Sequence, residues 1–365
     1  MRVGVLGGGQ LGRMLGLAGI PLGIQFRFLD ERRDVPAREV GELRIGSYQD
    51  HDLLQEFAAG LDVVTFEFEN IPVDSVRFLS EFVAVHPPAR ALAAAQDRLT
   101  EKNLFRDLGV ATAEFHAVDA RDDLDAAVAR LGLPLILKTR RGGYDGKGQC
   151  RIASASELGR AWKELGGQAL IAEALVPFER ELSVIGVRGR RGEMACFPLI
   201  QNEHVGGILD HSVAPAPRVP DELQKAAEAI VRSALEALEY VGVLAIELFD
   251  CDGKLLVNEM APRVHNSGHW TIEGAVCSQF ENHVRAVCGL PLGPTAACEH
   301  SVMLNLIGAV PPMEHVLACP GAHLHLYGKS PRPGRKLGHV TVLGETAEGA
   351  RAAAERVRGL RRNVL

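Results

Sequence analysis

A glycine-rich turn constrains the fold of this chain more than any other feature of its sequence. Residues 3–6 are mostly apolar, Gly7, Gly8 and Gly9 follow them, and residues 10–18, which include Gly12, have helical spacing. Glycines allow a tight turn between a strand and a helix, and a helix N-terminus presents backbone N–H groups to an anion. The pattern therefore predicts a β-α unit with an anion-binding turn between its two elements.

The alternation of strand and helix continues through the first 97 residues. Residues 26–30 and 63–68 are further apolar runs that indicate strands, and residues 51–59 have the spacing of a helix. Strands that alternate with helices pair in parallel and carry the helices on their faces. We therefore expect an amino-terminal domain, residues 1–97, with a Rossmann-like parallel sheet.

The same turn supports a different hypothesis. Gly7, Gly9 and Gly12 match the G-x-G-x-x-G pattern, and Asp30 ends the next strand where a ribose-binding acid is expected. This would make the protein an NAD-dependent oxidoreductase. However, the turn can also bind a substrate phosphate, because only backbone groups and the helix dipole are involved. A tight turn without any ligand is the third interpretation, and the rest of the chain favours chemistry other than hydride transfer.

Composition limits the class of protein. A chain of 365 residues suits two or three domains, and 47% hydrophobic with 24% charged residues is an ordinary globular balance. The formal net charge of −6 argues against nucleic acid as a partner. The 7 cysteines form no CxxC pair, which predicts reduced thiols in a cytoplasmic protein. No apolar run approaches the length that spans a membrane, so we expect no membrane partner.

Two further domains are expected after the first. Residues 98–290 combine predicted helices and strands in an α+β arrangement. Its predicted elements are the helices 99–108 and 222–238, the strands 135–138, 169–173 and 182–187, and a hairpin of residues 243–250 and 254–260. A proline- and glycine-containing segment after Leu290 marks the next boundary. The small carboxy-terminal domain, residues 291–365, is expected to be rich in strands, at 301–306, 322–327 and 339–343, with a closing helix at 347–357.

The loop after the strand 135–138 predicts a second anion site. It is not a Walker A loop, because no G-x-x-x-x-G-K-[ST] is present. Its glycines let the backbone approach phosphate oxygens, and Lys138 supplies a charge at the strand end. The residues that make this loop a phosphate cradle are Arg140, Arg141, Gly142, Gly143, Gly146, Lys147 and Gly148.

The hairpin predicts a metal site. Glu247 lies on its first strand and Glu259 on its second, with Asn258 beside it. Two acids on apolar strands are costly unless they are paired or bind a metal, and Mg²⁺ takes carboxylate, phosphate and water oxygens. Two glutamates that share a sheet face opposite a phosphate loop therefore fit a Mg-ATP site.

The register of this hairpin decides whether the two acids can share a cation, because side chains alternate between faces. We predict a three-residue loop, Cys251-Asp252-Gly253, which pairs Asp250 with Lys254. Glu247 would then lie opposite Val257 and diagonally beside Glu259. A two-residue turn would instead place Glu259 on the other face.

A run of polar side chains follows the hairpin directly, at residues 261–271. Arg263 can hold an anion with two hydrogen bonds, and His265 can donate a hydrogen bond or move a proton. The density of donors, together with one of only 2 tryptophans, indicates a functional segment rather than an ordinary surface loop.

These segments together resemble a known family. The middle of the chain resembles the ATP-grasp fold, and the whole chain is similar to the 5-(carboxyamino)imidazole ribonucleotide synthases of bacterial purine biosynthesis. The motifs that carry the resemblance, in order, are the glycine turn with residues 10–15, the segment 66–70, the segment 96–102, the loop 143–149, the run 258–271 and the segment 332–339.

The resemblance implies a reaction and its ligands. An ATP-dependent carbon–nitrogen ligase of this kind phosphorylates bicarbonate to carboxyphosphate, with Mg²⁺ as cofactor. Carboxyphosphate, or CO₂ released from it, then carboxylates the exocyclic amine of 5-aminoimidazole ribonucleotide. The expected partners are these small molecules, and we expect a homodimer.

The resemblance also implies roles for individual residues. Those implied for the ATP phosphates are Arg98, Lys138, Gly143, Tyr144, Asp145, Gly146, Lys147, Gly148 and Gln149. Those implied for adenine and ribose are Glu173, Ala174, Leu175, Val176, Glu181 and His204, while Glu247 and Glu259 would hold magnesium beside Asn258. The implied catalytic residues are Arg263, His265, Tyr144 and Asp145, of which Asp145 or His265 would accept the amine proton. The implied ribonucleotide pocket contains Gln10, Leu11, Glu67 or Glu69, Tyr144, Asp145, Asn266, Lys329 and Arg335.

One rival from the same fold class is the formate-dependent glycinamide ribonucleotide transformylase, which also phosphorylates a one-carbon acid. The tyrosine-containing glycine loop and the His-Asn-Ser-Gly-His-Trp run favour the carboxylating enzyme. A basic turn at residues 327–336 adds a candidate clamp for the substrate phosphate, because its prolines and glycines present Lys329 and Arg335 in a preformed loop.

Overall fold

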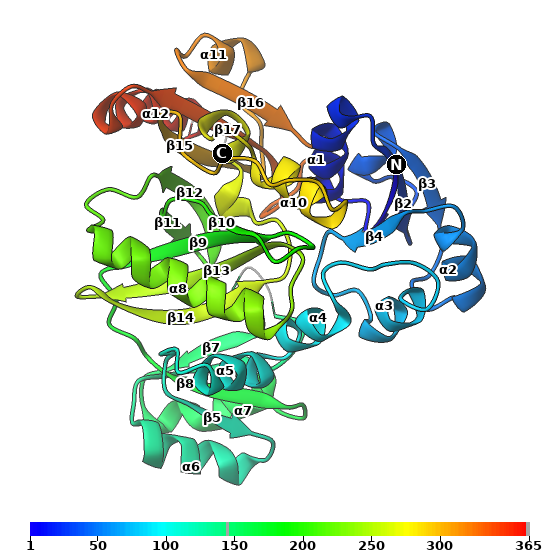
Figure 1. The fold of residues 1–365 in the computed structure, drawn as a ribbon. Coiled ribbons are helices and arrows are strands. Elements are labelled where there is room, and N and C mark those ends of the chain that lie inside the picture. The colour runs from blue at the N-terminus through cyan, green and yellow to red at the C-terminus, as the bar shows by residue number, and fades with distance from the viewer. Residues whose placement is uncertain (144–145, 363–365) are drawn as a thin grey trace.

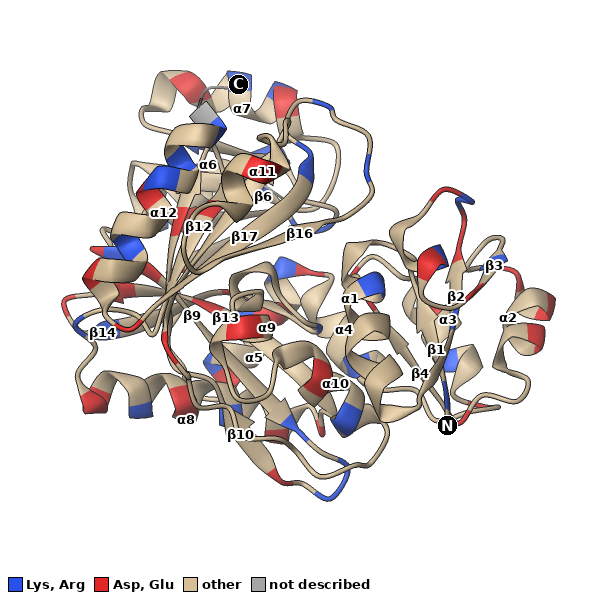
Figure 2. Cartoon of the chain, turned by 90° about the horizontal axis from the view of Figure 1, so that it is seen from above, with Lys and Arg blue, Asp and Glu red and all other residues tan. Residues whose placement is uncertain are grey.

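The computed structural model describes residues 1–143 and 146–362, and this part of the chain contains three sheets with helices on their faces (Figure 1). Two of these sheets have four strands and one has nine. Figure 2 shows the amino-terminal sheet set to one side of the other two. The predicted fold class is confirmed: a parallel α/β unit is followed by mixed units with antiparallel sheets.

The first sheet has the order β3-β2-β1-β4 and is parallel throughout. Its strands are β1 (Arg2–Leu6), β2 (Gln25–Asp30), β3 (Glu42–Ile45) and β4 (Val63–Phe66). Its helices are α1 (Gln10–Gly19), η1 (Ile20–Leu22), η2 (Pro36–Glu39), α2 (His51–Ala58), α3 (Val73–Leu79) and α4 (Ala89–Ala95). β4 is buried throughout, as apolar strands of parallel sheets are. The mostly exposed β3 was not predicted, because alternating charged residues give an edge strand a weak apolar signal.

The second sheet is antiparallel and has the order β5-β8-β6-β7 (lower part of Figure 1). Its strands are β5 (Phe115–Val118), β6 (Leu135–Thr139), β7 (Gln149–Ile152) and β8 (Leu170–Ala174). Its helices are α6 (Arg121–Leu131), η3 (Ala155–Glu157) and α7 (Leu158–Leu165), while α5 (Arg98–Asp107), which comes before them in the chain, packs against α4 and the third sheet. The predicted phosphate loop joins β6 to β7. These two strands contribute to an apolar core that is separate from the core of the central sheet.

The third sheet forms the centre of the molecule and has the order β14-β13-β9-β11-β12-β15-β17-β16, with β10 on β9. Its strands are β9 (Arg180–Arg188), β10 (Met194–Cys196), β11 (Ile200–Val205), β12 (Ile208–Ala214), β13 (Gly242–Cys251), β14 (Lys254–Ala261), β15 (His300–Ile307), β16 (Ala322–Leu326) and β17 (Lys336–Gly344). Its helices are α8 (Asp221–Ala237), η4 (Asn266–Gly268), α9 (Thr271–Gly274), α10 (Gln279–Val287), α11 (Met313–Leu317) and α12 (Ala347–Arg362).

This sheet runs across the predicted boundary at residue 290. β12 pairs with β15, so the carboxy-terminal strands extend the central sheet instead of forming a sheet of their own. The linker sequence after Leu290 indicates where the chain crosses over, but strand pairing between distant segments leaves no local signal. The division into residues 98–290 and 291–365 therefore stays a prediction about units of the chain.

Helix α10 joins the first sheet to the third. It is buried along most of its length and packs against α1. Leu11 and Leu15 of α1 and Phe280 and Val284 of α10 belong to one apolar cluster, which fixes the glycine turn in front of the central sheet. The amphipathic α8, predicted from its apolar stripe, covers the other side of the hairpin strands. Among the helices of residues 1–143 and 146–362, we find none with the length and apolar character needed to cross a membrane.

Asp97 connects the second unit to the phosphate loop. Its carboxylate caps α5 by accepting hydrogen bonds from the N–H groups of Leu99 (3.0 Å) and Thr100 (3.2 Å). It also accepts two from the Arg140 guanidinium, at 3.0 and 2.8 Å. Burial raises the pKa of Asp97, but the Arg140 and Thr100 hydrogen bonds outweigh burial and bring it below its ordinary value.

We predict that Asp97→Asn lowers the free energy of unfolding by about 1–3 kcal/mol near neutral pH, because asparagine keeps the cap but loses the ion pair. The pKa of Asp97 is depressed on folding, so its contribution is present above the unfolded-state pKa of about 3.9 and is lost as the pH falls through the lower folded value. Urea denaturation of both proteins at neutral and acidic pH measures this. The control is Asp34→Asn, an exposed partner of Arg38. An Asp97→Asn deficit that is equally large well below pH 3.9 would contradict the prediction.

Candidate active site

A cavity of about 1360 Å³ lies where the three sheets meet. It is lined by side chains from α1 and the segment after β4, from β6 and β8, from the face of the central sheet, and from the basic turn before β17. The described residues to which the resemblance gave a role all line it except Gly148, whose carbonyl accepts the Thr139 N–H and closes the loop. Three further residues of the predicted phosphate cradle, Arg140, Arg141 and Gly142, do not line it, because both arginines pair with Asp97 instead. Tyr144 and Asp145 lie outside the described residues.

One face of the central sheet supplies the polar wall of this cavity. Ser183 on β9 pairs directly with Glu247 on β13, and Glu181 two residues earlier points to the same side. Asn202 on β11 pairs with Glu181 and with Ser212 on β12, which puts all five side chains on one face. Strand alternation therefore places these polar side chains on one face across four strands. Glu181 and Glu247 line the cavity, whereas Ser183, Asn202 and Ser212 are buried and do not line it.

The hairpin does not have the predicted three-residue loop. Cys251 pairs with Lys254, and Asp252 (φ 54°) and Gly253 (φ 78°) form a two-residue turn with both residues in the left-handed region. Simple alternation would then place Glu259 on the far face. A β-bulge shifts the register between Glu247 and Leu248, so that Glu247 lies directly opposite Glu259. The predicted register was wrong, while the shared face of the two glutamates was right for a different reason.

Lys102 on α5 stabilises the β-bulge by hydrogen bonds to its backbone. Its ammonium donates to the carbonyl oxygens of Asn258 at 2.8 Å and Val257 at 3.3 Å, and its side chain is 1% exposed. Glu101, also buried, accepts a hydrogen bond from the Met260 N–H. Sequence analysis missed both residues. Their spacing from Phe105, three and four positions later on the same helix, was a signal that they lie on its buried side.

The paired glutamates carry mutual repulsion that a cation would relieve. Burial and the neighbouring charge of Glu259 raise the pKa of Glu247 to about 7. Burial alone would raise the pKa of Glu259, but Arg98, which donates to it at 2.7 Å, brings that pKa below its ordinary value. The Oδ1 atom of Asn258 is buried without a hydrogen-bond partner.

These oxygen donors fit magnesium, which prefers carboxylate, amide and phosphate oxygens. In the part of the chain that the structure describes, no group of three or more His, Cys, Asp or Glu side chains could hold a metal by itself. Any cation at Glu247 and Glu259 would therefore need oxygens from a bound substrate or water.

Lys138 and Glu173 form a buried ion pair of 2.9 Å between β6 and β8, and Lys102 lies 3.6 Å from the same carboxylate oxygen. Burial opposes ionisation of Glu173, but the charges of Lys102 and Lys138 outweigh it and hold its pKa at about 2. The Glu173 carboxylate thus faces cations of the site. The predicted adenine hinge at 173–176 would use backbone groups there, beside apolar wall residues that sequence analysis missed: Ala113, Ile136, Leu209 and Phe249.

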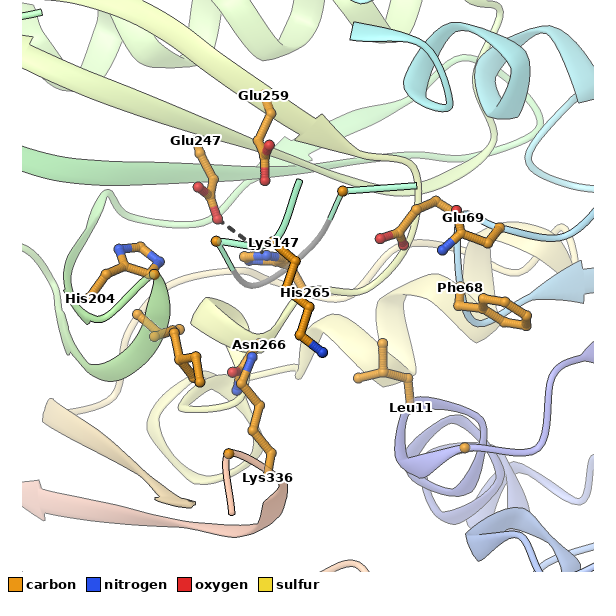
Figure 3. A pocket seen from close by; sticks show the side chains of 18 of the residues that line it. Leu11, Phe68, Glu69, Lys147, His204, Glu247, Glu259, His265, Asn266 and Lys336 are labelled. Atoms are coloured by element: carbon orange, nitrogen blue, oxygen red, sulfur yellow. Dashed lines mark ion pairs between the residues drawn. The ribbon is translucent and has the colours of Figure 1, made fainter. Parts of the chain in front are cut away.

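Glu181 and His204 come together from β9 and β11, with 2.5 Å between Oε2 and Nδ1. Burial lowers the pKa of His204, but the hydrogen bond to Glu181 and the charges of Glu247 and Glu181 together outweigh burial and raise it. This pair lies on the same wall as Glu247, on the side away from the first sheet (Figure 3).

Arg263, His265 and Asn266 lie between the glutamate pair and the basic turn. Arg263 donates to Glu69. Burial would raise the pKa of Glu69, but the Arg263 charge and the hydrogen bonds to the carboxylate together hold it at about 2. His265 points at the sheet, with its Nε2 atom 3.4 Å from Glu247 Oε1 (Figure 3). Asn266 exchanges two hydrogen bonds with the amide of Asn305, at 3.1 and 2.8 Å. Asn305 lies fully buried on β15 and had no local sequence signal.

The glycine turn holds a carboxylate of the protein itself. The Gly9 and Gly12 N–H groups donate to the two oxygens of Glu67, at 2.6 and 2.9 Å, and the Gly8 N–H donates to Asp30 at 2.9 Å. A Cβ at Gly9 would lie 2.4 Å from Glu67, so glycine is required for this approach. Burial raises the pKa of Glu67. Because these donors are satisfied internally and Asp30 binds the turn, the geometry does not support a dinucleotide phosphate there.

The basic turn reaches across to α1. Lys329 donates a hydrogen bond to the side chain of Gln10, and Arg335 is placed beside it by a hydrogen bond to the Ser330 carbonyl. Burial lowers the pKa of Lys329 to about 8. The basic turn of the third predicted unit therefore lines the same end of the cavity as α1 of the first unit.

Three sequence models of protein families match the chain. They are the "Ribonucleotide synthetase preATP-grasp domain" at residues 1–96, the "ATP-grasp domain" at residues 103–280 and the "Phosphoribosylaminoimidazole carboxylase C-terminal domain" at residues 301–353. N5-carboxyaminoimidazole ribonucleotide synthase of Pseudomonas aeruginosa is 53% identical over 342 residues, which cover 94% of this chain and 94% of that protein.

Solved structures agree with these matches. The crystal structure of N5-carboxyaminoimidazole ribonucleotide synthetase from Thermus thermophilus superposes with a TM-score of 0.95 at 54% identity and covers 98% of each chain. N5-carboxyaminoimidazole synthase from Aspergillus clavatus, solved with ADP and 5-aminoimidazole ribonucleotide, superposes with a TM-score of 0.92 at 32% identity over 99% of this chain and 98% of that one.

The internal anion at the glycine turn leads to a stability prediction. Glu67→Gln replaces one acceptor oxygen by an NH₂ group that faces a backbone N–H, so we expect the free energy of unfolding to fall by about 1–3 kcal/mol. Urea denaturation measures the change, and Glu81→Gln, at an exposed position of the same unit, is the matched control. Equal midpoints for Glu67→Gln and the wild type would contradict the role of this carboxylate.

Proposed function

The chain belongs to the N5-carboxyaminoimidazole ribonucleotide synthases, a family of ATP-grasp ligases, and we propose that it carboxylates the exocyclic amine of 5-aminoimidazole ribonucleotide. The products are N5-carboxyaminoimidazole ribonucleotide, ADP and phosphate, in the biosynthesis of purines. The observation that supports this most is the single cavity, in which the loop end, the glutamate pair, the 263–266 segment and the basic turn follow one another. A reaction that couples ATP to a second, phosphorylated substrate needs this order of groups.

ATP would bind between the second sheet and the central one. In this proposal Arg98, Lys138 and the loop residues 143–149 hold the phosphates, residues 173–176 contact adenine, and Glu181 with His204 contact the ribose. The ion pairs support this assignment, because Lys138 and Arg98 are already oriented by Glu173 and Glu259 before a nucleotide arrives. Preorganised cations lose little side-chain freedom on binding phosphate.

Magnesium would bind to Glu247 and Glu259, with Asn258 adjoining. When bound there, the ion neutralises phosphate charge and orients the transferred phosphoryl group. The two carboxylates would lose their mutual repulsion, which together with burial raises the pKa of Glu247.

Bicarbonate would bind beside Arg263, His265 and Asn266. A bicarbonate oxygen attacks the γ-phosphorus of ATP, which forms carboxyphosphate and releases ADP. The amine nitrogen then attacks the carboxyl carbon, or CO₂ formed from it, and phosphate leaves while the amine loses a proton. Tyr144 and Asp145, which lie outside the described residues, would act at this step, and Asp145 is a candidate base for the amine proton. Carboxyphosphate is short-lived in water, so a site closed on several sides by the three units suits it.

The ribonucleotide would bind at the end of the cavity near α1, with Gln10, Leu11 and Glu69 on one side and Lys329 and Arg335 at its phosphate. Glu67 would act on this pocket indirectly, through the glycine turn that it holds. The three units 1–97, 98–290 and 291–365 would thus bind ribonucleotide, ATP and ribonucleotide phosphate respectively.

We further propose a cytoplasmic homodimer that needs neither nucleic acid nor membrane. A monomer in sedimentation equilibrium would contradict the dimer.

We predict ADP formation that requires Mg²⁺ and is stimulated when 5-aminoimidazole ribonucleotide and bicarbonate are both present. The physical reason is that ATP cleavage is productive only when an acceptor for the short-lived intermediate is bound. A coupled ADP assay measures this, with formate and glycinamide ribonucleotide as the comparison pair. Stimulation by that pair in place of the first would assign the transformylase reaction instead, and no stimulation by either would reject the proposal.

We also predict that Lys329→Ala and Arg335→Lys each raise KM for the ribonucleotide about 10- to 100-fold, while KM for ATP stays near the wild-type value. A charge-assisted hydrogen bond to phosphate contributes about 1.5–3 kcal/mol, and lysine cannot reproduce the two-pronged contact of arginine. Steady-state kinetics with each substrate varied in turn measure this, with Arg351→Lys on the exposed side of α12 as the control. A defect confined to ATP would show that the clamp lies elsewhere.

A further inference from the structure

A chain of buried hydrogen bonds ends on His265. Ser212 Oγ donates to Asn202 Oδ1 at 2.8 Å, and Asn202 Nδ2 donates to Ser183 Oγ at 3.0 Å. Ser183 Oγ donates to Ser267 Oγ at 2.8 Å, and Ser267 Oγ lies 2.9 Å from His265 Nδ1. The three serines have no exposed surface. We name these four residues, Ser212, Asn202, Ser183 and Ser267, the serine–asparagine chain.

The direction of these hydrogen bonds fixes which ring nitrogen of His265 carries the proton. The backbone N–H of Ser267 donates to His265 Nδ1 at 3.3 Å, and a backbone N–H can only donate. Nδ1 is therefore an acceptor, which excludes a protonated imidazolium in this geometry and puts the single ring proton on Nε2. In every hydrogen bond of the serine–asparagine chain the donor is the residue nearer to Ser212. The Ser267 hydroxyl therefore accepts from Ser183 and can donate its own proton to Nδ1 as well.

The other side of the ring agrees with this assignment. His265 Nε2 lies 3.4 Å from Glu247 Oε1, where an N–H is attracted to the carboxylate and a lone pair would be repelled. The ring also cannot swing away easily, because the side chain of Gln279 holds the backbone of His265 at both its N–H (2.9 Å) and its carbonyl (2.6 Å). Gln279 is fully buried.

We propose that Ser183, Asn202 and Ser267 are positioning residues that hold His265 as the Nε2–H tautomer, so that His265 donates a hydrogen bond to the one-carbon substrate and does not remove the amine proton. The proposal rests on the function proposed above. Nε2 is the only ring nitrogen that faces the cavity, and it already carries a proton; a base would need a lone pair there. Of the two candidate bases from the sequence, His265 and Asp145, the geometry leaves His265 with the donor role.

The tautomer is tested directly by NMR of the whole protein labelled with ¹⁵N-histidine. The His265 signals are assigned among the 13 histidines by their loss in His265→Gln. We expect the pattern of an Nε2–H imidazole in the wild type, and a shift toward a mixture of tautomers in Ser183→Ala and Ser267→Ala. An Nδ1–H pattern in the wild type, or an unchanged pattern in both variants, would overturn the proposal. If Ser183→Ala does not fold, Ser267→Ala and the wild type decide the question.

Kinetics separate positioning from simple packing. We expect Ser183→Ala to lower kcat for ribonucleotide-dependent ADP formation about tenfold, with KM for ATP unchanged, since the hydrogen bonds from Asn202 and to Ser267 are both lost. The matched control is Ser301→Ala, which removes another fully buried hydroxyl, one without a hydrogen-bond partner. Wild-type kcat in Ser183→Ala, or an equal loss in Ser301→Ala, would count against the proposal. A wild-type protein without ribonucleotide-dependent ADP formation would reject the proposed function, and the NMR result would still decide the tautomer.

Discussion

Lys102 donates to the carbonyl oxygens of Val257 and Asn258, at the point where β14 bulges, and much of the site depends on this contact. A bulge leaves backbone groups without a ladder partner, and burying them unpaired would cost about 1–3 kcal/mol each. The ammonium of Lys102 satisfies both, so the bulge is stable at a buried position. The bulge in turn moves Glu259 onto the face of Glu247. Without it the two-residue turn would separate the carboxylates and no shared cation could bind.

Charge balance explains why so many ionisable groups can line one cavity. Each carboxylate of the nucleotide end has a cation within contact distance: Glu173 has Lys138, and Glu259 has Arg98. Glu247 is the exception, since it faces a neutral His265 and another acid. Burial and the charge of Glu259 raise its pKa to about 7. The imbalance lies at the position where a divalent cation would complete the set. At the other end, burial lowers the pKa of Lys329 to about 8, and a substrate phosphate would favour its charged form.

The polar network behind the site links units that are distant in sequence. Asn305 on β15 fixes the amide of Asn266, and the serine–asparagine chain orients His265 from β9, β11 and β12. Both networks are buried in the central sheet, and the contact of Asn266 with Asn305 depends on strand pairing across the boundary after Leu290. Glu67 has a similar role in the first unit, where it orders the glycine turn and α1. The segment 263–266 is thus held by Asn305 and the serine–asparagine chain, none of which lines the cavity.

The sequence by itself determined the parallel amino-terminal sheet, the phosphate loop, the hairpin with its two acids and the polar run at 261–271, because glycine turns, apolar periodicity and clustered donors are local signals. It also identified half of the residues that line the cavity. Tertiary structure alone decided three things. The hairpin register depended on Lys102, a residue more than 150 positions from the bulge that it holds. The glycine turn depended on Glu67, which filled with a carboxylate the place where the local pattern suggested a ligand phosphate. The role of His265 depended on hydroxyls from other strands. In each case a hydrogen bond between segments far apart in the chain contributes, such as that from Ser183 to Ser267, and such a bond leaves no pattern in either segment.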